Sequence, residues 1–295
     1  MTVCDAHVHF LSPKFFAALG ASPERVAEIG MEFPESAEAL ADRWVAELDK
    51  NGVSRSAMIA STPNDADSVA IAIKRHPSRF VGFFMLDPTK PGWEAYATHA
   101  LDAGHRTICL FPAMHQYSTK DPIVDEVFRL AASRPGTVVF VHCGELSVGI
   151  RGKLGLPNSF DPTLGNPYFL IRMVERHPEV PIIIPHLGGT MFENARTLID
   201  RPCQVYLDTS SSNSWLARTN KNLGFSDAIN IVMSLMPTDR LLFGTDSSFF
   251  PRGWNRTIFD TQREQISDWL FAELRPKMFA ENFNRLFPSV KDGHD

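Results

Sequence analysis

Two histidines near the start of the chain, His7 and His9, stand one residue apart in an apolar run. If residues 3–10 form a β-strand, alternate side chains point the same way, so Asp5, His7 and His9 share one face. The two imidazoles would then be about 7 Å apart along the backbone, and both could bind one cation at about 2.0–2.1 Å. The pair predicts a metal site, although a chance pairing remains open on this motif alone.

The elements that would position these histidines repeat in a regular order. Short apolar runs alternate with amphipathic stretches that end at Gly or Pro. We expect strands at 3–10, 55–61, 80–86, 107–111, 137–143, 182–186, 205–208 and 241–246. We expect helices at 37–51, 63–75, 92–103, 121–133, 168–176, 190–199 and 226–236, with closing helices over 257–287.

Strands that read as continuous apolar runs indicate a parallel sheet covered on its outside by helices, and eight such strands close a barrel. We therefore predict an α/β fold, a (β/α)8 TIM barrel, as a single domain over residues 1–295. A doubly wound sheet is the alternative. It is disfavoured because no Gly-x-Gly-x-x-Gly follows the first strand, and Gly188-Gly189 is too short to hold a pyrophosphate. Residues 11–35 are too long for a turn, so we expect a lid-like loop there, with a short helix near 13–19.

Composition limits the class of partner. The chain is 44% hydrophobic and 21% charged, which is ordinary for a globular protein, and its net charge of −5 leaves no basic face for nucleic acid or a membrane surface. It shows neither a signal peptide nor an apolar run of the roughly 18 residues that span a bilayer. We expect a cytoplasmic protein with a small-molecule substrate, and a homodimer or higher homo-oligomer remains open. The four widely spaced cysteines are predicted to be reduced, packed thiols: Cys4, Cys109, Cys143 and Cys203.

Polar residues gather at the predicted strand ends, which in a closed barrel meet in one cup. His7 and His9 end strand one, and the later ends carry His142, His186 and Asp246 on strands five, six and eight. A further carboxylate, Asp208, ends strand seven and is a candidate site residue without an assigned role. The remaining histidines are predicted to be structural or solvated, with His115 alone able to reach the cup: His76, His99, His105, His115, His177 and His294.

Five ordered motifs give the chain a family likeness. They are Asp5-Ala6-His7-Val8-His9-Phe10, Val141-His142-Cys143-Gly144, Pro185-His186-Leu187-Gly188-Gly189, Phe243-Gly244-Thr245-Asp246-Ser247 and Glu281-Asn282-Phe283-Asn284-Arg285-Leu286-Phe287. As a set they resemble the amidohydrolase superfamily. They are most similar to its amidohydrolase-2 branch, which contains aminocarboxymuconate-semialdehyde decarboxylase, resorcylate decarboxylases and pyrone-dicarboxylate lactonase.

The resemblance implies that His7, His9, His142 and Asp246 hold one divalent metal, with His186 beside the water that the metal activates. Zinc is the metal expected and manganese is the alternative, because imidazole and carboxylate ligands suit both. Binuclear members carry a carboxylated Lys at the end of strand four, and this strand, residues 107–111, has no Lys. One metal is therefore expected. Glu145 is a further ligand candidate or a residue that contacts substrate.

The same residues permit two reactions. In a hydrolase, activated water attacks an amide, ester or lactone, with Asp246 as proton acceptor and His186 orienting the water or stabilising charge. In a non-oxidative decarboxylase, the site protonates a carbon of an aromatic or unsaturated acid as carbon dioxide leaves. Arg252 and Arg151, in the loops after strands eight and five, are candidates to bind a substrate carboxylate, although loop arginines are often only solvated.

Overall fold

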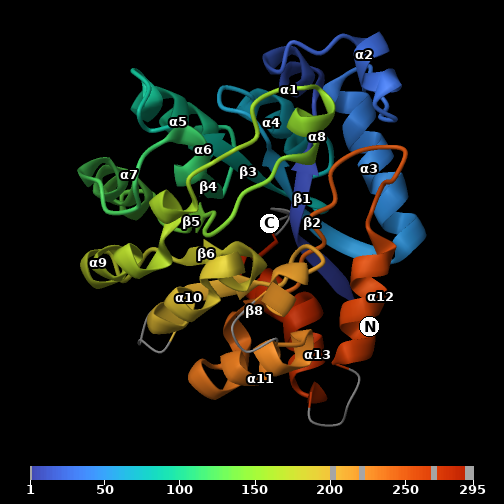
Figure 1. Cartoon of the computed structure of the whole chain (residues 1–295). Helices are drawn as coiled ribbons and strands as arrows, with labels where there is room; N and C mark the ends of the chain where they lie inside the picture. Colours follow the sequence, from blue (N-terminus) through green and yellow to red (C-terminus); the bar gives the residue numbers. More distant parts are fainter. Residues whose placement is uncertain (1, 200–203, 219–222, 267–270, 290–295) are drawn as a thin grey trace, which may run out of the picture.

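The structure is a computed structural model that describes residues 2–199, 204–218, 223–266 and 271–289. Eight parallel strands follow one another around a barrel in chain order, with helices on the outside (Figure 1). The strands are β1 (Val3–Phe10), β2 (Val53–Ala60), β3 (Phe80–Leu86), β4 (Thr107–Leu110), β5 (Val138–Val141), β6 (Ile182–Ile184), β7 (Val205–Asp208) and β8 (Leu241–Leu242). The predicted (β/α)8 barrel is confirmed.

The barrel closes between the first and last strands by an irregular seam. β8 is much shorter than the predicted 241–246, because residues 243–247 leave regular strand geometry. They still pair with β1: the Ala6 and His9 amides donate to the carbonyls of Phe243 and Ser247 at 2.8 and 2.7 Å, and the Asp246 amide donates to the His7 carbonyl at 3.0 Å. The seam therefore joins two predicted site strands directly.

Helices fill the connections between the strands much as predicted. After β1 come α1 (Pro13–Ala18), α2 (Pro23–Glu28) and α3 (Ala37–Asn51), and the next connections hold α4 (Ala66–Arg75), α5 (Trp93–Asp102), α6 (Pro112–His115) and α7 (Pro122–Ala132). The second half contains α8 (Gly149–Lys153), η1 (Pro162–Gly165), η2 (Pro167–Leu170), α9 (Ile171–Arg176), η3 (Pro185–Met191), α10 (Phe192–Ile199), η4 (Ser214–Arg218), α11 (Phe225–Leu235) and η5 (Thr238–Arg240). The chain closes with α12 (Arg256–Gln265), α13 (Leu274–Pro276), the π-helix η7 (Lys277–Glu281) and α14 (Asn282–Leu286).

The buried apolar residues form two layers. The larger cluster lies between the sheet and the surrounding helices, and the smaller one fills the barrel. Phe283 and Phe287 belong to the inner cluster, and Arg55, near the start of β2, donates to the Phe287 carbonyl at 2.7 Å. The closing helices therefore cover the amino-terminal end of the barrel. The carboxyl-terminal end is left for the site.

One local prediction on β1 is wrong. Cys4 and Ala6 pack inside the barrel while Val8 packs outside, so the strict alternation breaks between Ala6 and Val8, where the pairing with β2 shifts register. Asp5 therefore does not share the face of His7 and His9. An irregularity of this kind re-aims side chains locally, and here it turns the His7 ring toward the interior ring of Phe140, 5.3 Å between centroids.

Residues 11–35 form a compact segment rather than an open loop. Its two helices begin at serines, Ser12 and Ser22, whose hydroxyls accept the Phe15 and Arg25 amides in N-capping bonds. They bury a small third apolar cluster that includes Phe16, Val26 and, from α8, Ile150. The segment's role as a lid stays a prediction, as does the assignment of residues 1–295 to one domain.

Cys4, Cys109 and Cys143 are buried free thiols, as predicted, whereas Cys203 and His294 lie outside the described residues. Among the helices that the structure describes, none is both long and apolar enough to cross a bilayer.

Candidate metal centre

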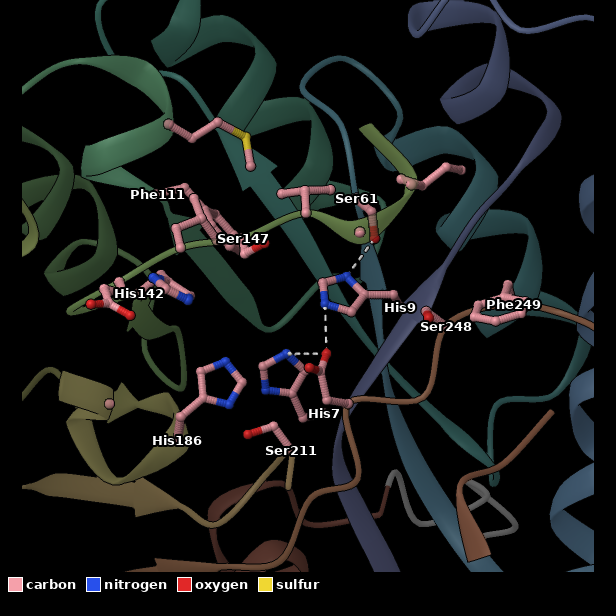
Figure 2. Close-up of a pocket in the computed structure, with 18 of the residues that line it drawn as sticks. His7, His9, Ser61, Phe111, His142, Ser147, His186, Ser211, Ser248 and Phe249 are labelled. Carbon is pink, nitrogen blue, oxygen red and sulfur yellow. Dashed lines mark hydrogen bonds and ion pairs between the residues drawn. The ribbon is translucent and has the colours of Figure 1, made fainter. Parts of the chain in front are cut away.

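A cavity of about 410 Å³ opens above the carboxyl ends of the strands. Its floor carries the five residues that the strand ends predicted to meet: His7, His9, His142, His186 and Asp246. Figure 2 shows the four imidazoles side by side. The structure therefore brings together, in one cavity, side chains from β1 and from the ends of β5, β6 and β8.

The tightest group joins His7, His9 and Asp246. The Nε2 atoms of His7 and His9 face the same carboxylate oxygen, Asp246 Oδ1, at 3.7 and 3.2 Å. Three potential ligand atoms from two ends of the chain thus lie within bonding reach of one small ion. Burial alone would raise the pKa of Asp246, but the His9 hydrogen bond and the neighbouring imidazoles hold it well below its usual range.

The tautomer of His9 follows from its partner. The Ser61 hydroxyl donates to the Ile59 carbonyl at 2.9 Å, so its oxygen accepts from His9 Nδ1 at 2.8 Å. His9 therefore carries a hydrogen on Nδ1, which leaves Nε2 as the ring atom that faces Asp246 Oδ1. Two acceptors that face each other need a cation between them, either a proton or a metal ion.

His7 is oriented by Asp208, the carboxylate at the end of β7. His7 Nδ1 donates to Asp208 Oδ2 at 3.0 Å, and both side chains are almost fully buried. Burial disfavours the charged form of both groups, but the attraction between them is larger. Asp208 therefore raises the pKa of His7, and His7 lowers the pKa of Asp208. A carboxylate behind a histidine in this way fixes the ring and makes its other nitrogen a better ligand.

His186 is held through Ser210. The Ser210 hydroxyl donates to Asp208 Oδ1, so its oxygen accepts from His186 Nδ1 at 2.9 Å, and the Ser210 carbonyl is a second acceptor at 3.2 Å. His186 Nδ1 thus carries the hydrogen, and Nε2 is an acceptor. Burial and the charge of His7 lower the pKa of His186, which favours this neutral form.

The backbone at two of these residues adopts left-handed geometry, with φ of +55° at His186 and +58° at Asp246. Such conformations are unfavourable for residues other than glycine and persist where the surroundings impose them, often at functional sites. After His186 the turn continues left-handed to Gly189, and a Cβ on Gly188 would lie 2.7 Å from that of Ala195. The Gly188-Gly189 pair therefore serves this sharp turn.

Asp5 supports the seam from behind. Its two oxygens accept the His7 and Thr245 amides at 2.9 and 3.1 Å, the Thr245 hydroxyl at 2.5 Å and Trp254 Nε1 at 2.7 Å. Burial raises the pKa of Asp5 to about 6 even though these hydrogen bonds lower it. Asp5 thus ties the bulged backbone at His7 to the turn that presents Asp246.

His142 lies apart from this group. Its ring stacks on Phe111, 5.4 Å between centroids, and meets His186 edge to face at 5.4 Å. Among the described residues, none makes a hydrogen bond to its imidazole. Burial, helped by His186 and His7, holds the pKa of His142 well below its usual value, so it is neutral. It is a lone-pair donor in the same cavity, outside the tight clusters of ligand atoms.

The two predicted arginines differ in placement. Arg252 lines the cavity, where its Nη2 donates to Ser248 Oγ at 2.9 Å and its guanidinium lies 4.5 Å from the centre of the Phe249 ring. Arg151 is not among the described residues that line the cavity; its Nε donates instead to the Pro157 carbonyl at 2.8 Å. The structure therefore brings Arg252, and not Arg151, to the site.

Several lining residues were not predicted as site residues. Ser61 ends the second predicted strand but lacks ligand chemistry, so it is not a site candidate from the sequence, whereas the structure shows that it orients His9. Lys153 and Arg218 supply further positive charge to the cavity without any signal in the sequence. Arg218 forms an ion pair with Glu145 at 2.8 Å. The Glu145 carboxylate, which was a candidate metal ligand, is therefore already bound to a cation. The apolar wall consists of Leu11, Phe15, Met31, Met85, Phe111, Met114, Leu146, Val148, Ile150, Trp215 and Phe249.

The donor set fits a divalent metal. It offers two imidazole nitrogens with fixed tautomers, a carboxylate oxygen and, nearby, the imidazole of His142, which has no hydrogen-bond partner among the residues described; this combination suits zinc or manganese. The second group of ligand atoms, from His7, His186 and Asp208, is already joined by the Ser210 hydroxyl. With no Lys on β4, the arrangement fits one metal rather than two.

Comparison with known proteins gives three findings. Residues 4–288 match the family model described as amidohydrolase. A probable 2-pyrone-4,6-dicarboxylic acid hydrolase from Acinetobacter baumannii, solved with citric acid, is 14% identical with a TM-score of 0.65, covering 97% of this chain and 99% of that one. A Pseudomonas putida protein with a similar provisional description is 17% identical, with a TM-score of 0.66 and 99% coverage of both chains.

A Burkholderia multivorans amidohydrolase solved with bound zinc is 12% identical, with a TM-score of 0.64 over 98% of this chain and 100% of that one. At such identities the solved structures show the shared fold. None of the curated proteins matches the sequence of this chain.

Proposed function

Because the chain belongs to the amidohydrolase family, we propose that it is a metal-dependent hydrolase that opens an amide, ester or lactone bond in a small carboxylated or cyclic substrate. One divalent ion, zinc in the first instance and manganese as the alternative, would be held by His7, His9, Asp246 and His142. The observation that carries this proposal is the convergence of the His7 and His9 Nε2 atoms on Asp246 Oδ1, at 3.7 and 3.2 Å.

A divalent cation at this place would act as a Lewis acid that polarises a substrate carbonyl and makes water more acidic. The chain's own residues then handle the protons. Asp246, ionised in the structure, accepts a proton from the attacking water and passes it to the leaving oxygen or nitrogen. His186 Nε2 accepts a second hydrogen bond from that water and so orients it toward the carbonyl carbon.

Arg252 is the residue proposed to bind a substrate carboxylate. It is an exposed residue on the cavity wall, and its described contacts are the Ser248 hydroxyl, the Asp246 carbonyl and the Phe249 ring, none of which neutralises its charge. A guanidinium whose described contacts carry no negative charge favours an anionic, bidentate partner. Arg218, by contrast, already has Glu145. Arg151, turned toward the Pro157 carbonyl, remains a prediction for which the geometry offers no support.

The proposal is tested with protein loaded separately with zinc and with manganese. The panel contains 2-pyrone-4,6-dicarboxylate, which the names of the structural neighbours suggest, together with simpler lactones, aryl esters, anilides and hydroxybenzoic acids. Ring opening or ester cleavage without carbon dioxide release is the expected result. Carbon dioxide release from an aromatic acid would replace the proposal with the decarboxylase alternative.

Two variants complete the test. Asp246→Asn should abolish turnover, whereas Arg252→Lys should raise KM for carboxylated substrates far more than for uncharged esters. Turnover that survives complete removal of metal, checked by elemental analysis, would refute a metal-dependent reaction.

A further inference from the structure

A second cavity of about 300 Å³ lies behind one wall of the active-site cavity. It is lined by the segment 11–35, by α3 and by the loop that follows β8. Three residues line both cavities: Leu11, Ser248 and Phe249. These three therefore form a partition between the two spaces. Figure 2 shows Ser248 and Phe249 beyond His9, on the side of the site away from His142.

Phe249 is the largest member of the partition. Its ring is only partly buried; it packs against the third apolar cluster and lies near two cations, Arg252 at 4.5 Å and Lys153 at 5.8 Å from the ring centre. The backbone is fixed separately, because the Phe249 carbonyl accepts the Gly253 amide at 3.0 Å. Removing the ring would therefore open the partition and leave the loop in place.

The second cavity is suited to an apolar group. Phe16, Phe33 and Phe250 supply aromatic walls, with Phe16 and Phe33 in contact at 5.3 Å between centroids. The charge of Arg43 is neutralised by Glu32, with which it forms an ion pair, and the guanidinium also stacks on Phe250 at 3.9 Å. Glu35 lines the cavity as well, and a hydrocarbon chain would make its favourable contacts with the three rings.

We propose that Phe249 limits the length of ligand that the site accepts. The ligand class is a carboxylate with an unbranched apolar tail, whose head lies at Arg252 and whose tail runs toward Phe249. In the wild-type protein the tail ends at the ring, and without the ring it continues into the second cavity. The position of the carboxylate rests on the proposed function; the partition itself rests on the two cavities.

The experiment measures binding, so that it does not depend on turnover. Straight-chain monocarboxylates from propanoate to decanoate are titrated into the zinc-loaded protein by calorimetry. Affinity should rise by about fourfold per buried methylene until the chain meets a wall. We expect the wild-type series to reach a plateau at a short chain, and the Phe249→Ala series to continue rising for several further methylenes.

Two controls separate the partition from a general loosening. Phe15→Ala removes the same ring from a part of the wall that faces only the first cavity, so its plateau should stay at the wild-type chain length. Ala39 faces only the second cavity, from the exposed side of α3, so adding Ala39→Phe to Phe249→Ala should restore the short plateau. Phe249→Leu should give an intermediate plateau, which keeps the test available if the alanine variant does not fold.

The outcomes are distinct. A longer plateau in Phe249→Ala that Ala39→Phe reverses supports the proposal, even if no hydrolytic substrate is found. An unchanged plateau in both Phe249 variants, or a wild-type affinity that rises along the whole series or shows no dependence on chain length, overturns it. Failure of the proposed function shows separately, as absence of turnover on the panel of esters and lactones.

Discussion

The floor and the roof of the first cavity are built in opposite ways. The floor residues His7, His9, His186 and Asp246 are supported from behind by Asp5, Ser61, Asp208 and Ser210, through hydrogen bonds that orient the rings of His7, His9 and His186. The roof, formed by residues 11–35 and α8, is a small apolar cluster that includes Phe15, Phe16 and Ile150. Hydrogen bonds are directional and apolar contacts are not, so the floor fixes geometry while the roof fixes mainly shape.

For the proposed function, this difference assigns the two halves of the reaction. Proton transfer and metal binding need atoms placed to within a fraction of an ångström, which the floor supplies through partners such as Asp208 and Ser61. Discrimination among ligands depends on volume, which the roof and Phe249 control. Changes in the floor should therefore abolish activity, and changes in the roof should shift preference.

The largest expected effect comes from breaking the floor at Asp246. Asp246→Asn removes the charge on which His7 and His9 converge, so both zinc content and kcat/KM should fall, the latter by about 10²–10⁴-fold. Asp87→Asn, at a buried carboxylate whose partner is Thr89, is the matched control and should leave zinc content unchanged. Equal zinc content in both variants would show that Asp246 does not hold the metal.

A measurement of stability against pH tests whether acid destabilises the protein by protonating groups of the floor or by protonating His105, which is buried outside the floor. Burial lowers the pKa of His105 to about 4, even though the hydrogen bond from Nδ1 to the Ala100 carbonyl raises it, and Nε2 is buried without a described partner. The unfolded chain binds a proton at His105 more tightly than the folded chain does. The contribution of neutral His105 to the free energy of unfolding is therefore complete above pH about 6.5 and is lost as the pH falls toward 4. This contribution amounts to about 3 kcal/mol.

His105→Asn keeps a donor but cannot titrate. Urea denaturation between pH 7.5 and 4 should show a smaller loss of unfolding free energy in this variant than in the wild type. His99→Asn, at an exposed position on α5, serves as the control and should retain the wild-type slope. If the unfolding free energy of His105→Asn falls with pH as steeply as that of the wild type, the loss of stability in acid comes from other groups, in the floor or elsewhere.

The support behind the floor can be tested with a pair of tryptophans. Trp254 Nε1 donates to the buried Asp5 carboxylate at 2.7 Å, whereas Trp44 Nε1 is buried with no partner among the described residues. Both Trp→Phe changes lose similar packing, but only Trp254→Phe loses a hydrogen bond to an acid. It should cost about 2 kcal/mol more in unfolding free energy than Trp44→Phe. Equal costs would mean that the Asp5 bond adds no stability.

The smallest expected effect is in the roof. Ile183→Val, inside the barrel, should lower the unfolding free energy by about 1 kcal/mol. Ile150 lies in the roof cluster, which can open locally without unfolding the barrel. Ile150→Val should therefore lower the free energy of global unfolding by less than about 0.5 kcal/mol. Ile150→Val should instead alter KM two- to fivefold at constant kcat, roughly the loss of one buried methylene. A larger stability loss at Ile150 than at Ile183 would contradict the distinction between floor and roof.

Apolar periodicity predicted the order of strands and helices because each strand is buried on both faces, a property of short sequence windows. The positions of His7, His9, His186 and Asp246 followed from one topological rule, that strand ends meet at one end of a barrel. The alternation on β1 failed because its irregularity arises where it pairs with residues 243–247, far away in the sequence.

Side-chain direction in loops was the other limit. Arg151 and Arg252 look alike in the sequence, but only Arg252 meets a serine and a ring on the cavity wall. The same limit hid Ser210, which reads as one serine among several in a polar turn yet bonds to both His7 and His186. Neither composition nor local spacing records such contacts.

The seam between β1 and the turn after β8 has a consequence for biosynthesis. Asp5 and Thr245 are 240 positions apart, and the proposed metal ligands His7, His9 and Asp246 sit on either side of that same junction. A nascent chain still on the ribosome, or a half-barrel fragment, holds only one side of it. Tight zinc uptake should therefore begin only when the last strand has been made and docked, which makes the ion a reporter of completed ring closure.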